Sequence, residues 1–148
     1  MRKSAEYFSD KELVCKSDNV VRLDPVFDEE LYKLRKKFNL PMKVNSCCRS
    51  RERNRQVGGR PKSFHIYDDP QWAGLEGCAA IDIGYSDITY RNALARLAYE
   101  LGWRIGYNKH FLHLDVAAIK GILPKAIFKY DNITAGELAE FTKQITGK

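Results

Sequence analysis

A single carboxylate inside an apolar run constrains this chain more than any other feature. Residues 78–83 read Cys-Ala-Ala-Ile-Asp-Ile, which predicts a compact buried strand that contains Asp82. A carboxylate is costly to bury unless a cation meets it, because the charge loses its hydration. An aspartate that ends a strand is otherwise a helix cap or a loop anchor. We therefore expect Asp82 either to end the strand in one of those roles or to face a cation.

Two histidines are the candidate partners of this carboxylate. His113 lies between leucines in the apolar run 111–116, and the alternation of a strand would put Phe111, His113 and Asp115 on one face. His65 follows a turn marked by glycines and a proline. Two histidines and one carboxylate, with a fourth position left to water, form a ligand set that catalytic zinc uses. Each histidine alone could equally be a hydrogen-bonded core or surface side chain.

The remaining periodicity predicts an α+β fold, with a small antiparallel sheet and flanking helices in a single domain over residues 1–148. Helices are predicted by capping residues and by one-sided apolar spacing, and strands by short apolar runs, of which the last two form a hairpin. The arginine-rich segment 49–62 is expected to be a loop, and residues 66–77 a long excursion without regular structure. The expected helices are 9–15, 24–38, 88–101 and 134–145, and the expected strands are 42–46, 78–83, 103–107 and 111–116.

The charge of the chain points toward anionic partners. The formal net charge is +6, and residues 49–62 contain six basic residues and one acidic residue. Nucleic acid, an anionic membrane face or an anionic cell-wall polymer would suit this charge, and a solvated arginine-rich loop would also explain it. No nucleic acid is expected, because the basic segment lacks interleaved aromatic residues and no reader motif is present.

The sequence also indicates where the chain is made and whether its cysteines are paired. The N-terminus has no apolar stretch of a secretory signal, and no run is long enough to cross a membrane, so we expect synthesis in the cytoplasm. Four cysteines in that setting are expected to be reduced, and the absence of a CxxC motif argues against a structural zinc knuckle.

The order of short motifs resembles the M15 peptidases. The matching pieces are Tyr7-Phe8-Ser9, Ser46-Cys47-Cys48-Arg49-Ser50, Asn54, Val57-Gly58-Gly59, Ser63-Phe64-His65, Ala80-Ile81-Asp82-Ile83, Gly106 and His113-Leu114-Asp115-Val116. This family contains zinc D-Ala-D-Ala carboxypeptidases and peptidoglycan endopeptidases, including phage endolysins, and shares a fold with the hedgehog signalling domain. The resemblance covers residues 7–116, and a C-terminal helical tail, 117–148, lies outside it.

The resemblance implies one zinc ion in a cleft on the sheet, held by His65, Asp82 and His113. It places Arg49 near the substrate, where a guanidinium could stabilise a tetrahedral oxyanion or hold a carboxylate. Ser63 would help to shape the same pocket. Asp115 would orient a ligand imidazole, or would simply end its strand.

Two departures from the family pattern bear on this interpretation. The interval between His65 and Asp82 is longer than usual in the family, so residues 66–81 form an insert. This insert could be a lid or specificity loop over the cleft, or it could carry a changed function. Its polar and aromatic residues include Tyr67, Asp68, Asp69, Trp72 and Glu76. Several branches have an acidic general base three residues before the last histidine ligand, where this chain has His110. We expect His110 to take that role, because an imidazole can accept and return a proton.

These inferences predict a zinc-dependent peptidase that hydrolyses peptide bonds in peptidoglycan stem peptides, of the endolysin or DD-carboxypeptidase type. Its partner would be peptidoglycan or a muropeptide, and not a membrane. A phage lysin released by a holin or carried on the virion, or a cytoplasmic enzyme that recycles muropeptides, would fit the missing signal. The alternative is a non-catalytic, zinc-stabilised module that binds an anionic polymer or cell wall. Oligomeric state is not predicted.

Overall fold

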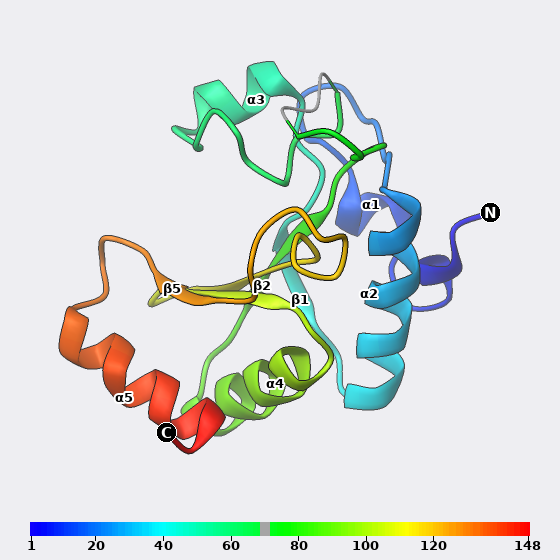
Figure 1. The fold of residues 1–148 in the computed structure, drawn as a ribbon. Coiled ribbons are helices and arrows are strands. Elements are labelled where there is room, and N and C mark those ends of the chain that lie inside the picture. Colours follow the sequence, from blue (N-terminus) through cyan, green and yellow to red (C-terminus); the bar gives the residue numbers. More distant parts are fainter. Residues whose placement is uncertain (69–71) are drawn as a thin grey trace.

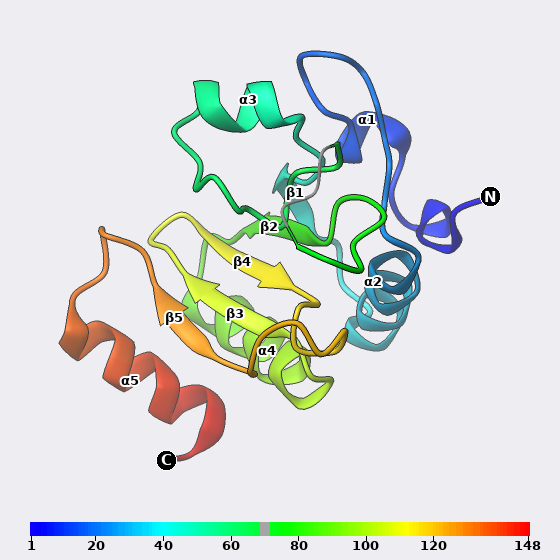
Figure 2. The same ribbon diagram turned by 45° about the horizontal axis from the view of Figure 1, so that its top comes forward.

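A five-stranded sheet forms the centre of the molecule in a computed structural model, which describes residues 1–68 and 72–148. The strand order is β1-β2-β4-β3-β5, and Figure 2 shows β2, β4, β3 and β5 side by side. The first three pairs are antiparallel, but β5 runs parallel to β3. The prediction of an α+β fold is confirmed, and the sheet is mixed instead of antiparallel. The strands are β1 Lys43–Ser46, β2 Ala80–Gly84, β3 Arg104–Tyr107, β4 Phe111–Asp115 and β5 Ile127–Lys129.

Helices cover the sheet unequally. In Figure 1, α4 and α5 lie on one side of the sheet and α3 lies on the other, while α2 runs alongside. The edge-on contact between Phe27 of α2 and Trp103, which precedes β3, has a ring-centroid distance of 5.9 Å. The helices are the 3-10 helix η1 Lys3–Glu6 and the α-helices α1 Asp10–Leu13, α2 Pro25–Phe38, α3 Arg51–Gln56, α4 Ile88–Glu100 and α5 Ala135–Thr146.

The register of β2 against β4 decides which side chains share a face. Asp82 pairs with His113, and the neighbouring pair is Ile83 with Leu112. Paired residues project to the same side and successive residues alternate, so the apolar pairs occupy one face and the polar pairs the other. The apolar residues are fully buried, which anchors the strands and thereby places Asp82 beside His113.

Capping residues begin three of the predicted helices. Ser9 caps α1 and Thr134 caps α5, each with a glutamate three residues later that completes a capping box. Asp24 caps α2, with a proline at the first turn. Gly102, which follows the C-cap Leu101 of α4, adopts φ +97°, a conformation that glycine adopts without steric cost.

Three elements were not predicted, and the first of them is the 3-10 helix η1. The segment expected to be an arginine-rich loop contains α3, whose N-cap Ser50 accepts a hydrogen bond from the backbone of Arg53. Its six residues are all polar, so they carry no amphipathic spacing that would indicate a helix. The tail expected to be helical contains β5, three residues long at the edge of the sheet, before the predicted last helix. No helix in the described part of the chain has the length and apolar character needed to cross a membrane.

The buried side chain of Asp24 joins three segments that are far apart in sequence. One carboxylate oxygen caps α2 through the backbone nitrogens of Val26 and Phe27. The other accepts hydrogen bonds from the backbone of Glu76 and from the ammonium group of Lys120. The excursion before β2 and the turn after β4 are therefore both fastened to the start of α2.

We predict that Asp24→Ala lowers the free energy of unfolding by roughly 3 kcal/mol, because it removes a helix cap and one partner of a largely buried ion pair. Asp24→Asn keeps an oxygen for the cap and should cost about half as much. Urea denaturation measures both, and Ser9→Ala is the matched control for an exposed cap, with an expected cost of about 1 kcal/mol. Equal losses in Asp24→Ala and Ser9→Ala would contradict the joining role.

Candidate metal centre

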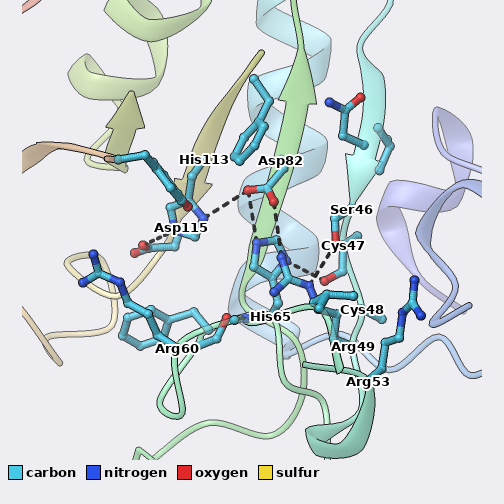
Figure 3. Close-up of a pocket in the computed structure, with 18 of the residues that line it drawn as sticks. Ser46, Cys47, Cys48, Arg49, Arg53, Arg60, His65, Asp82, His113 and Asp115 are labelled. Atoms are coloured by element: carbon cyan, nitrogen blue, oxygen red, sulfur yellow. Dashed lines mark hydrogen bonds and ion pairs between the residues drawn. The ribbon is translucent and has the colours of Figure 1, made fainter. Parts of the chain in front are cut away.

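A cleft of about 1010 Å³ opens on the face of the sheet that carries Asp82 and His113. Figure 3 shows Asp82 on β2 between His113 on one side and His65 and Arg49 on the other. The structure brings together the three residues that the sequence suggested as ligands. One donor atom from each of His65, Asp82 and His113 lies within 4.8 Å of the other two. All three side chains are buried, with exposed fractions of 2%, 3% and 6%.

His65 directs a lone pair toward Asp82. Its Nδ1 lies 2.7 Å from the carbonyl oxygen of Cys47, and because a carbonyl only accepts, Nδ1 carries the hydrogen. Its Nε2 then faces Asp82 Oδ1 at 3.1 Å without a hydrogen of its own. Burial lowers the pKa of His65, which favours this neutral form. Two acceptors at this distance repel each other unless a cation is shared between them.

His113 lies between two carboxylates. Its Nδ1 is 3.1 Å from Asp82 Oδ1, and its Nε2 is 2.8 Å from Asp115 Oδ2. Burial alone would lower the pKa of His113, but hydrogen bonds to Asp115 and Asp82 outweigh it and raise the pKa to about 9. Asp115 is fully buried and also accepts hydrogen bonds from Arg104 and from the backbone of Ala117. The contact of Asp115 with His113 Nε2 is the geometry that an orienting carboxylate would need.

This donor set fits a divalent metal ion. Burial would raise the pKa of Asp82, but the imidazoles of His65 and His113 hold it well below its usual range, so the carboxylate is ionised. Each imidazole uses its far nitrogen for a fixed acceptor, which leaves the near nitrogen free to ligate. Two nitrogens and one carboxylate oxygen, beside an open cleft, are the donors of a site with a remaining position for water.

Arg49 is held against this group by three side chains. Its guanidinium donates to Ser46 Oγ at 3.1 Å, to Asn54 Oδ1 at 2.9 Å and to Asp82 Oδ2 at 3.4 Å. Gly59 permits this arrangement, because a Cβ atom there would lie 2.2 Å from Asn54 Oδ1. Ser46, Asn54 and Asp82 thus form one network that fixes the guanidinium of Arg49 beside the carboxylate.

Ser63 and His110 differ in where the structure places them. Ser63 lines the cleft, and its hydroxyl accepts a hydrogen bond from the backbone of His65 at 3.1 Å. His110 is exposed in the turn between β3 and β4 and is not among the residues that line the cleft. Three residues of extended chain separate it from His113, roughly 10 Å. The structure therefore does not bring the expected general base to the site.

The insert is attached to the N-terminal part of the chain. Tyr67 donates to Asp18, and Asp68 accepts from the backbone of Arg51 at 2.7 Å. Trp72 lines the cleft, where its ring stacks on Phe64 with a centroid distance of 5.3 Å. Asp69 lies outside the described residues. Of the insert residues that the structure describes, Trp72 is the one that forms a wall of the cleft.

Two aromatic residues at the site were not predicted from the sequence, because they follow the segment that carries the motifs. Phe128 on β5 pairs with Gly106 on β3, and a Cβ atom at Gly106 would lie 2.7 Å from the phenylalanine ring. The centroid of the Phe128 ring lies 5.7 Å from the centroid of the His113 ring. The centroid of the Tyr130 ring lies 6.4 Å from the same histidine ring. Burial and the charge of Asp82 raise the pKa of Tyr130, so its hydroxyl stays protonated at neutral pH. The alternating run Ile-Phe-Lys-Tyr was the signal that could have revealed this wall.

The comparisons with known proteins agree with this geometry. A family model described as Peptidase M15 matches residues 6–115, a range that includes the three candidate ligands and Arg49. No curated protein matches the chain.

We predict that a divalent metal ion displaces about one proton when it binds. Below about pH 9 the metal-free His113 is protonated because its pKa is raised, whereas burial lowers the pKa of His65 and the neighbouring imidazoles hold that of Asp82 well below its usual range. At about pH 6, where a zinc-bound water would still keep its protons, calorimetry in buffers of different ionisation enthalpy should report one proton released per ion. The share of the release that comes from His113 should fall as the pH rises past about 9, where a zinc-bound water would supply a proton instead.

Asp115→Asn is the informative variant for this prediction. It removes a carboxylate that raises the pKa of His113, so less proton release is expected at the same pH. If the unaltered protein binds the metal ion without releasing a proton, the ion has not displaced the proton of His113. His113 is then not a ligand.

Proposed function

The chain belongs to the peptidase M15 family, and from this premise we propose that it is a zinc metallopeptidase that hydrolyses peptide bonds in peptidoglycan stem peptides. We further propose that His65, Asp82 and His113 hold one zinc ion. The observation that carries this proposal is the approach of His65 Nε2 to Asp82 Oδ1 at 3.1 Å. Both atoms are hydrogen-bond acceptors in a buried site, so they repel each other. A cation bound between them would remove this repulsion.

The surrounding residues suit hydrolysis of an amide. When bound, zinc would polarise the scissile carbonyl and lower the pKa of a water molecule to about 7. Arg49 would donate to the oxygen of that carbonyl as negative charge develops on it, from a position that its three partners already fix. Tyr130 would offer its protonated hydroxyl as a second donor at the wall of the cleft.

The charge of the cleft supports an anionic substrate. Eight basic and four acidic residues line it, and three of the acids, Asp82, Asp115 and Glu12, already have partners in the structure. Figure 3 shows Arg53 and Arg60 at opposite sides of the pocket. Stem peptides that carry free carboxylates would be attracted into such a cleft. Release to the cell wall by a holin, or carriage on a virion, stays part of this proposal.

A second candidate function is favoured by the position of His110. Without that imidazole in the cleft, the expected proton shuttle is missing, and a zinc-stabilised module that binds an anionic wall polymer would need none. Both functions require the metal and the basic cleft. They differ in whether covalent bonds of the substrate are broken.

We predict that the purified, zinc-loaded protein converts muropeptides to smaller products that mass spectrometry identifies. Loss of a terminal D-alanine would indicate a carboxypeptidase, and cleavage of a cross-link would indicate an endopeptidase. His113→Ala and treatment with a chelator should each abolish the conversion. Arg49→Lys should retain zinc but lower kcat by roughly 10²–10³-fold, because the donors to the developing oxyanion are lost.

Arg96→Lys is the matched control for the arginine variant. Arg96 lies on α4 and donates to the backbone of Gln144, so its replacement should leave hydrolysis unchanged. His110→Ala tests the proton shuttle separately, and a loss of turnover with zinc retained would show that the exposed turn reaches the substrate. Tight binding of wall fragments without any new product would support the binding module and refute the peptidase.

A further inference from the structure

Three cysteines from two parts of the chain meet in the core beside His65. Cys47 and Cys48 follow β1, and Cys78 precedes β2. Their exposed fractions are 2%, 3% and 0%, and all three are free thiols. Their sulfur atoms lie within 4.8 Å of one another, and Cys47 Sγ is 3.6 Å from Cys78 Sγ. The peptidase chemistry proposed above uses none of these thiols.

Neighbouring cysteines would normally project to opposite sides of a strand. Here the ladder between β1 and β2 shifts its register between Val44 and Ser46, and the strand ends at Ser46. The backbone nitrogen of Cys48 instead donates to Leu13 at 3.1 Å. The chain has therefore left the regular strand where the two cysteines occur, and both thiols can join Cys78.

The spacing of the sulfur atoms is close to that around a single metal ion. Zinc–sulfur bonds are about 2.3 Å long, so three sulfurs on one ion stand roughly 3.8–4.0 Å apart. Small side-chain rotations would bring the three thiols to this separation. Thiolates select soft metal ions, and a divalent ion leaves less net charge in the core than a monovalent one.

We propose that Cys47, Cys48 and Cys78 form a second metal site, which takes one soft divalent ion such as Cd²⁺ or Zn²⁺. Three metal–sulfur bonds form, and the three S–H protons leave to solvent. The site shares no ligand with His65, Asp82 and His113, so it goes beyond the proposed peptidase function and does not depend on it. The two groups meet at one point, where the Cys47 carbonyl accepts the hydrogen bond from His65 Nδ1.

The metal-free form has its own set of contacts. Cys78 Sγ lies 3.2 Å from the carbonyl oxygen of Ala80 and 3.3 Å from that of Cys47, and Cys48 Sγ lies 3.9 Å from that of Arg22. These carbonyls can accept the S–H hydrogens, so the chain can fold before the ion binds. Ion binding then exchanges protons for metal within an existing cluster.

The test is a titration of the fully reduced, full-length protein with Cd²⁺, followed by the ultraviolet charge-transfer absorption that reports thiolate–cadmium bonds. We expect the absorption to saturate at one ion per chain. Cys48→Ser and Cys78→Ser should each weaken this binding by at least about tenfold, because one of three thiolates is lost. Asp82→Ala should leave the absorption in place, since that carboxylate belongs to the other group.

Cys15→Ser is the matched control, because Cys15 is an equally buried cysteine outside the cluster. It should keep the absorption of the unaltered protein. X-ray absorption of the unaltered cadmium complex counts sulfur neighbours and needs no variant, so the test survives a variant that fails to fold. Three sulfur neighbours would support the site, and fewer than three, or no charge-transfer absorption from verified free thiols, would overturn it.

Discussion

The buried carboxylate of Asp82 is the constraint on which the arrangement of the surrounding segments depends. It has an exposed fraction of 3%, and three basic side chains converge on it from three different segments. The charge of His113 and the hydrogen bonds from His113 and Arg49 keep it ionised in a place where an unpaired carboxylate would be too costly to bury. Because those segments are fastened to the carboxylate, the arginine-rich region, the turn before the insert and β4 all take their positions relative to β2.

The two faces of the sheet have different roles: one packs into the hydrophobic core, and the other carries the candidate metal ligands. Ile81, Ile83 and the leucines of β4 bury the face that α4 covers, and this packing fixes the register in which Asp82 lies opposite His113. A shift by one residue would turn the polar pair into the apolar face, so the hydrophobic pattern indirectly sets the geometry of the site. Gly106 completes the arrangement from the next strand, because its missing side chain lets Phe128 lie over His113.

A residue or element of the site could be predicted from the sequence only where the local sequence pattern was strong. Asp82 and His113 were identifiable because each interrupts an apolar strand, and such an interruption has few structural explanations. His65 lies in irregular chain, where only its place in the order of motifs marked it. Helix α3 has no apolar side, so it produces no periodic pattern, and β5 has three residues, so its alternating run is short. The place of His110 outside the cleft could not be foreseen, since its distance along the chain from His113 says nothing of which way an exposed turn points.

Residues 47–49 connect the two groups of potential ligands, and their chemistry explains how both can exist so close together. The Cys47 carbonyl orients His65, the Arg49 guanidinium contacts Asp82, and the two thiols in this segment turn toward Cys78. One group offers nitrogen and oxygen donors beside an open cleft, and the other offers sulfur alone in the core. Sulfur donors favour softer ions, whereas imidazole and carboxylate suit borderline ions that also accept water. Donor type therefore separates the two groups where distance does not, and an ion held at the thiols would stiffen the carbonyl that aims His65.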